Sequence, residues 1–117
     1  MTINSYQDLI VWQKAFRLAI QVYKVTQNMP KEEIYGLTSQ MRRSAVSIPS
    51  NIAEGYSRHS SAAYKQFLSY SLGSKSELET QLLICKEIGY LNKEDIVTLL
   101  DLLNEIGKMI NSLIQKV

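Results

Sequence analysis

Residues 35–58 have the sequence YGLTSQMRRSAVSIPSNIAEGYSR and carry two helical patterns at once. Apolar side chains recur at steps of three and four, and polar side chains do the same on a second, narrow stripe. At about 100° of turn per residue, the two stripes lie roughly 120° apart. An ordinary amphipathic helix specifies one face, so this helix is expected to carry an ordered polar face as well. The apolar stripe contains Leu37, Met41, Ala45, Ile48, Ile52 and Tyr56, and the polar stripe contains Gln40, Arg43, Ser47, Asn51, Glu54 and Arg58.

The rest of the sequence predicts three more helices and no strands. Strand-like alternation is absent, and two prolines and five glycines are the only strong helix breakers. The predicted helices cover about residues 6–27, 37–57, 61–88 and 93–116. Short connections between helices favour antiparallel neighbours, so the fold class is all-α, an up-down-up-down four-helix bundle forming a single domain over residues 1–117.

Local signals place the helix ends. Ser5 with Asp8 three residues later is typical of an N-cap, and Pro30 disfavours helical geometry in the residue before it. Gly89 closes the third predicted helix. Pro49 lies inside the second, where both stripes continue in register beyond it, so we expect a kink and not a stop.

The first predicted helix is apolar on more than one face. One stripe consists of Leu9, Trp12, Phe16, Ala19 and Tyr23, and another of Val11, Ala15, Leu18, Val22 and Val25. A helix that is apolar on two faces buries two faces. In a chain of 117 residues, the second burial is expected to be against another subunit.

Composition limits the class of protein. The net charge is +2, but residues 1–58 hold seven Lys and Arg against four Asp and Glu, and all four arginines lie there. A single cysteine, Cys85, excludes an internal disulfide and fits a reducing compartment. No apolar run approaches the ~20 residues of a membrane span, and the N-terminal residues lack the pattern of a secretory signal. We therefore expect a cytoplasmic protein with no membrane partner.

Residues for catalysis or metal binding are scarce. The one histidine, His59, lies in a predicted loop, and Cys85 falls on the inward stripe of another helix. The Glu-x-x-His pattern of di-iron bundles is absent, no serine has an evident base partner, and no glycine-rich phosphate loop occurs. The sequence predicts neither an enzyme nor a metal or cofactor site.

Basic residues are the better candidates for a function. If the first two helices are neighbours, their basic side chains could form one patch for nucleic-acid phosphates, which oligomerisation would repeat. The seven tyrosines could stack on bases, although packing residues with one wet end are the favoured interpretation. The candidate nucleic-acid-binding residues are Lys14, Arg17, Arg42, Arg43 and Arg58.

The polar stripe has a second, structural interpretation. Glu54 and Arg58 have the favourable order for a helical ion pair. Gln40, Ser47, Asn51 and Glu54 could form a polar network that fixes helix register or subunit geometry. We favour this interpretation over direct ligand binding by the stripe.

Several short motifs together resemble a known family, that of the bacterial four-helix-bundle proteins named for reading frames in intervening sequences of 23S ribosomal RNA genes. The resemblance covers nearly the whole chain, and SIPSNIAEG is its most specific part. Ser44, Ser71 and Cys85 stand where the family is expected to have alanine. The motifs are VWQKA (11–15), YGL (35–37), QMRR (40–43), SIPSNIAEG (47–55), FL (67–68), GS (73–74), ELE (77–79) and GYL (89–91).

The resemblance implies an antiparallel four-helix bundle assembled as a ring-like homopentamer. It also implies similarity to Avd, the accessory protein of diversity-generating retroelements, which has a basic surface and works with nucleic acid and a reverse transcriptase. It brings no catalytic residues. The first hypothesis is therefore a non-enzymatic oligomer that binds RNA or DNA, and the alternative is a homo-oligomeric scaffold for another protein.

Overall fold

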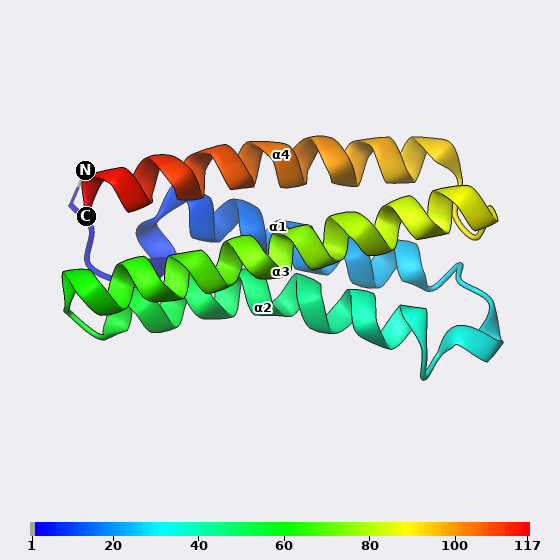
Figure 1. Ribbon diagram of the computed structural model, residues 1–117, viewed down its shortest axis with the longest axis horizontal. Coiled ribbons are helices and arrows are strands. Elements are labelled where there is room, and N and C mark those ends of the chain that lie inside the picture. The colour runs from blue at the N-terminus through cyan, green and yellow to red at the C-terminus, as the bar shows by residue number, and fades with distance from the viewer. Residues whose placement is uncertain (1) are drawn as a thin grey trace.

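The computed structural model describes residues 2–117, and within them every regular element is helical (Figure 1). The four long helices are α1 (Ile10–Thr26), α2 (Leu37–Ser57), α3 (Ser61–Ile88) and α4 (Lys93–Lys116). Two short 3-10 helices, η1 (Tyr6–Asp8) and η2 (Lys31–Glu33), precede α1 and α2. The predicted all-helical class with four long helices is confirmed.

The helices alternate in direction and form an elongated bundle of 42 × 24 × 20 Å (Figure 1). The helix pairs in contact are α1–α2, α2–α3, α3–α4 and α1–α4, which closes a four-sided arrangement. The α2–α3 pair has the most extensive contact. None of the helices formed by residues 2–117 has the length and apolarity that a membrane span requires.

The first helix begins later than predicted. Ser5 and Asp8 form a capping box, in which the Asp8 carboxylate accepts from the backbone N–H groups of Asn4 and Ser5 at 2.8 and 3.2 Å. The capping box precedes the short helix η1 and not α1. Leu9 is extended, with φ −74° and ψ 126°, and it packs against the core. The predicted range 6–27 is therefore wrong at its start, since α1 begins at Ile10. The ranges of α2, α3 and α4 coincide with the predicted ones.

Capping side chains and one glycine set the ends of α3 and α4. The Ser60 hydroxyl accepts from the Ala63 N–H, and the Asn92 side chain accepts from the Asp95 N–H at 2.8 Å. Gly89 ends α3 in the left-handed region at φ 84°, which glycine adopts without strain. α2 continues through Pro49.

All four helices contribute to one apolar core. Met29, Met41 and Cys85 form a sulfur cluster at the end of the bundle nearest η2, with Cys85 Sγ 3.6 Å from Met41 Sδ and 3.9 Å from Met29 Sδ. Burial, with a smaller contribution from Glu33, raises the pKa of the Cys85 thiol to about 11. Cys85 is therefore a neutral packing residue at physiological pH.

Candidate functional site

The polar stripe of α2 lies along its contact with α3, which we call the seam. Small side chains there allow the two helices to pack close together. The Asn51 amide donates to Ser47 Oγ at 2.9 Å, and the Ser74 hydroxyl of α3 donates to the same oxygen at 2.8 Å. Ser44 Oγ donates to Gln81 Oε1 of α3 at 2.8 Å, and both residues are buried. The seam thus brings Ser47 and Asn51 into one network, as the structural interpretation of the stripe requires.

Not all predicted members of the network take part in it. Glu54 pairs with Arg58 at 3.2 Å on the exposed side, and Gln40 makes no side-chain hydrogen bond to another of residues 2–117. Sequence reasoning missed Ser44, which donates to Gln81, and Ser71, which donates to the Ile48 carbonyl at 2.9 Å. The signal available for them was the small-residue character of α3 near Gly73, which indicates a close helix neighbour.

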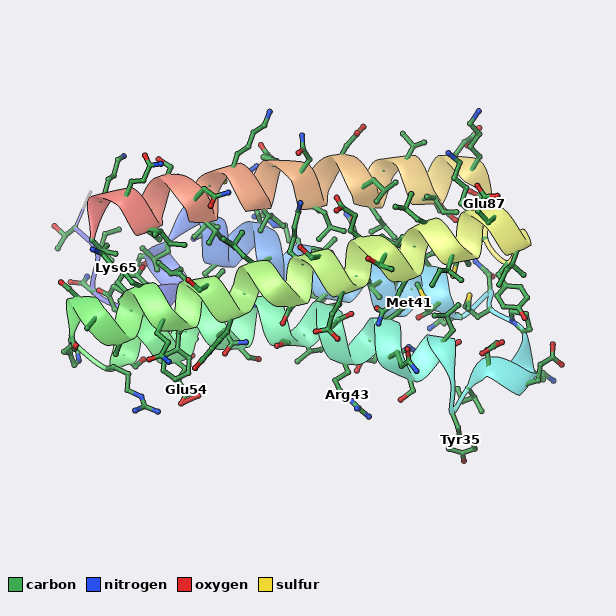
Figure 2. The ribbon with its side chains drawn as sticks, viewed as in Figure 1. Tyr35, Met41, Arg43, Glu54, Lys65 and Glu87 are labelled. Carbon is green, nitrogen blue, oxygen red and sulfur yellow. The ribbon has the colours of Figure 1, made fainter. Side chains whose placement is uncertain are left out.

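A polar pocket of about 340 Å³ opens between α2 and α3. Arg43 and Glu77 lie at its rim as exposed residues of opposite charge. Its lining consists of Gln40, Arg43, Ser44, Ser47, Glu77 and Gln81. Figure 2 shows Arg43 and Glu54 projecting from α2 away from α4.

Arg42 lies outside this pocket, on the side of α2 that contacts α1. Its Nε donates to Thr26 Oγ1 at 2.9 Å, and its guanidinium lies 4.8 Å from the centre of the Tyr23 ring. Adjacent residues on a helix differ by about 100° in direction, so Arg42 contacts α1 while Arg43 lies by α3. The cation–π contact and the hydrogen bond both hold Arg42 against the bundle.

Of the other candidate basic residues, Lys14 and Arg17 are one turn apart on α1, and Arg58 lies at the end of α2. Lys14 pairs with Glu105 of α4 at 3.2 Å, and Arg58 pairs with Glu54 and lies over the Phe67 ring. Arg17 is exposed on α1 and makes no ion pair within residues 2–117. The five predicted residues therefore do not merge into one patch on a single chain. Exposed ion pairs contribute only ~0–1 kcal/mol, so Lys14 and Arg58 can exchange their partners for a phosphate at small cost.

An apolar groove of about 580 Å³ runs between α1 and α2. The aromatic stripe of α1 lines it, with Trp12 stacked on Phe16 at a ring-centre distance of 5.0 Å. Phe16, Ile20, Tyr23 and Val46 remain 46%, 42%, 44% and 41% exposed. The other stripe of α1, which contains Leu18 and Val22, faces the core. One apolar face of α1 is thus without a partner in the single chain.

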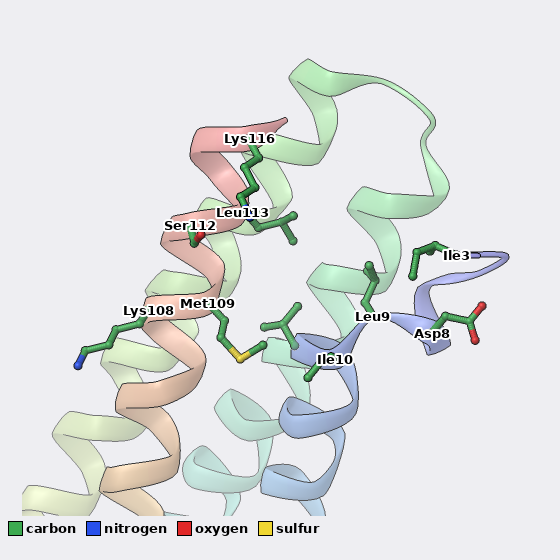
Figure 3. A pocket seen from close by; sticks show the side chains of 10 residues that line it. Ile3, Asp8, Leu9, Ile10, Lys108, Met109, Ser112, Leu113 and Lys116 are labelled. Carbon is green, nitrogen blue, oxygen red and sulfur yellow. The ribbon is translucent and has the colours of Figure 1, made fainter. Parts of the chain in front are cut away.

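A second groove of about 570 Å³ separates the N-terminal segment from the C-terminal half of α4 (Figure 3). Ile3, Leu9 and Ile10 face Met109 and Leu113 across it. Its remaining lining residues include Asp8, Lys108 and Lys116. The Asp8 carboxylate is already engaged in the capping box.

Within residues 2–117 no three His, Cys, Asp or Glu side chains gather closely enough to hold a metal ion. Burial and then Tyr56 raise the pKa of Tyr64, whose hydroxyl is buried without a hydrogen-bond partner. A hydrogen bond to Glu33 raises the pKa of Tyr90 and links η2 to the α3–α4 connection.

Comparison with known families decides the relationship of the chain. The profile of the family described as "23S rRNA-intervening sequence protein" matches residues 7–112. The chain belongs to this family. The match includes α1, α2 and α3 and all but the last turn of α4.

A solved member of the S23 ribosomal protein family shares the fold of this intervening-sequence protein. It is the crystal structure of a protein of unknown function from Bacteroides thetaiotaomicron, with a TM-score of 0.81 and 26% sequence identity. The alignment covers 90% of this chain and 98% of the other. No curated protein matches the chain.

The Ser44–Gln81 hydrogen bond is expected to stabilise this family member measurably. Ser44→Ala removes the donor and leaves Gln81 Oε1 buried without it, which costs about 1–3 kcal/mol of unfolding free energy. Replacing both partners, as Ser44→Ala with Gln81→Leu, is expected to recover most of that loss. Urea unfolding of the two single variants and the double variant measures the coupling energy. Additive losses would show that the two side chains do not interact.

Proposed function

We propose that this chain is a non-enzymatic helical bundle that assembles with copies of itself and binds RNA or DNA through the basic side chains that assembly repeats. The observation that supports this most is the apolar groove between α1 and α2. Four large apolar side chains there are more than two-fifths exposed, and they are contiguous with buried ones. Contiguous apolar patches on soluble proteins mark interaction sites.

A second copy of the chain is the proposed occupant of this groove. The groove is lined by aromatic side chains, which are enriched at subunit interfaces. Burying surface that is still exposed on Phe16, Ile20 and Tyr23 would contribute about 25 cal/mol per Å² toward association. A ring-like homopentamer, which the family resemblance implies, is the expected assembly.

Assembly would turn scattered basic residues into a repeated surface. Arg17 and Arg43 are exposed without an ion pair in the described part of the chain, and Lys14 and Arg58 have only surface pairs. Each contact with a phosphate is weak, but several copies on one particle bind one strand with increased avidity. The family name refers to 23S rRNA, which is compatible with an RNA partner.

The oligomeric part of the proposal is tested by sedimentation of a groove variant. Phe16→Ser with Ile20→Ser is expected to convert an oligomer to monomers that keep their helical content. Ile84→Ser with Ile88→Ser is the matched control, because both side chains are 43% or more exposed and neither lines the groove. A wild-type chain that sediments as a folded monomer would contradict the proposal.

Nucleic-acid binding is tested by filter binding of single-stranded and double-stranded RNA and DNA across salt concentrations. Affinity is expected to fall steeply with salt, because binding releases counterions. Arg17→Gln with Arg58→Gln is expected to weaken binding and to flatten the salt dependence. Lys93→Gln, which removes a lysine at the start of α4, is the control. Negligible binding at low salt would refute this part.

The alternative function is a homo-oligomeric scaffold for another protein. It is favoured by the contacts of Arg42 with Tyr23 and Thr26. These contacts hold the least exposed arginine against α1, so it is less available to bind a phosphate. Co-purification separates the two proposals. A protein partner that is retained by the Arg17→Gln, Arg58→Gln variant supports the scaffold.

A further inference from the structure

Each side chain that lines the pocket between α2 and α3 carries a polar group. Small-molecule pockets in proteins are mostly apolar with a few placed polar groups. Here Gln40, Ser44, Ser47 and Gln81 provide amide and hydroxyl groups, and Arg43 and Glu77 provide the charges. The volume of about 340 Å³ is sufficient for a small metabolite.

The floor of the pocket presents fixed hydrogen-bond donors. Gln81 is only 9% exposed, and its Oε1 accepts from Ser44, so its Nε2 amide is the end left to donate. Ser47 Oγ already accepts from Asn51 and from Ser74, so its own O–H is left to donate. Two donors, one held by a buried hydrogen bond and the other by part-buried ones, favour a ligand group that only accepts, such as a carboxylate.

The rim carries one cation and one anion that do not neutralise each other. Arg43 and Glu77 line the same pocket, yet neither forms an ion pair within 4.0 Å with any of residues 2–117. A simple anion would be attracted by Arg43 and repelled by Glu77. A simple cation would be attracted by Glu77 and repelled by Arg43. A ligand with both charges is attracted by both residues.

We propose that this pocket binds a small zwitterion that carries a carboxylate and an ammonium group, of which a free α-amino acid is the simplest. The carboxylate meets Arg43 and the donors of Gln81 and Ser47, and the ammonium meets Glu77. This site does not depend on the proposed assembly or on nucleic-acid binding. It gives the ordered polar stripe of α2 a ligand in addition to its structural role.

Three small probes that present different charged groups test the proposal by NMR titration of the full chain. Glycine carries both charges, N-acetylglycine lacks the ammonium group, and methylamine lacks the carboxylate. Glycine is expected to bind at least about tenfold more tightly than either of the others, because each lost charge removes charge-assisted hydrogen bonds. The shifted amide signals are expected to cluster at residues 40–47 and 77–81.

Variants at the rim assign the two charges. Arg43→Gln is expected to weaken glycine binding about tenfold or more and to leave methylamine binding no weaker than in the wild type, and Glu77→Gln is expected to leave N-acetylglycine binding no weaker than in the wild type. Lys93→Gln and Glu87→Gln are matched controls, since both side chains are exposed and outside the pocket. Equal affinity for the three probes, or shifts elsewhere in the bundle, would overturn the proposal. Glu77→Gln is not expected to weaken nucleic-acid binding, so the two proposals fail separately.

Discussion

Met41→Ala is expected to lower the free energy of unfolding by about 2–5 kcal/mol. Met41 is fully buried, and its sulfur lies 3.6 Å from that of Cys85. Truncation would leave a cavity between α2 and α3 that the surrounding side chains can fill only in part, so a cavity term adds to the lost transfer free energy. Met41→Leu conserves volume and is expected to cost less than about 1.5 kcal/mol.

The measurement is urea unfolding at one protein concentration, because association would add to apparent stability. A lower midpoint at an unchanged slope would identify a change in stability. Met109→Ala is the matched control, because Met109 also lies on a helix but is half-buried beside an open groove. Similar losses for the two alanine variants would contradict the placement of Met41 in the core.

Cys85 supplies a second readout of the same cavity. The folded chain holds the thiol pKa at about 11 against an ordinary 9.0, so less thiolate is present at pH 8 and alkylation is slow. Met41→Ala is expected to speed alkylation by opening the packing around the sulfur. The unfolded thiol ionises first as pH rises, so this contribution to stability is complete below about pH 9 and is lost toward pH 11. Unfolding midpoints measured from pH 7 to 11 test the sign.

The sequence predicts helices well where an end has its own chemical signal. Ser60 and Asn92 act as caps by local hydrogen bonds, and Gly89 supplies a left-handed residue, so those ends depend on nearby residues alone. The start of α1 is different, because a Ser5–Asp8 capping box closes a single 3-10 turn as well as a long helix. What extends Leu9 is its contact with the core, and a local pattern does not contain that contact.

The candidate site was predictable in part for a related reason. The spacing of Ser47 and Asn51 places them on one stripe of α2, and the network there follows from that spacing. The partners Ser74 and Gln81 depend on the register of α3 against α2, which no periodicity within one helix specifies. The arginines show the same limit, since neighbours in sequence such as Arg42 and Arg43 face different helices.

Gly55→Ala is expected to destabilise the chain by about 1–3 kcal/mol, although alanine favours a helix over glycine by about 1 kcal/mol. A Cβ atom at position 55 would lie 2.7 Å from Phe67 Cβ and 3.3 Å from a ring carbon of Tyr64. Phe67 Cβ is attached directly to the backbone of α3, so the contact is relieved only by separating α2 from α3. Overpacking therefore outweighs the gain in helix propensity.

Gly73→Ala, on α3, is expected to have the opposite effect and to stabilise the chain. No atom lies within 4 Å of a Cβ at this exposed position of α3, so the propensity gain of up to about 1 kcal/mol is retained as added stability. Urea unfolding of the two variants is expected to move the midpoint in opposite directions. If both alanines stabilise the chain, α2 and α3 are farther apart than described. The Ser47–Ser74 and Ser44–Gln81 hydrogen bonds require the close approach of the two helices. That result would therefore also contradict these hydrogen bonds and the floor of the pocket that they form.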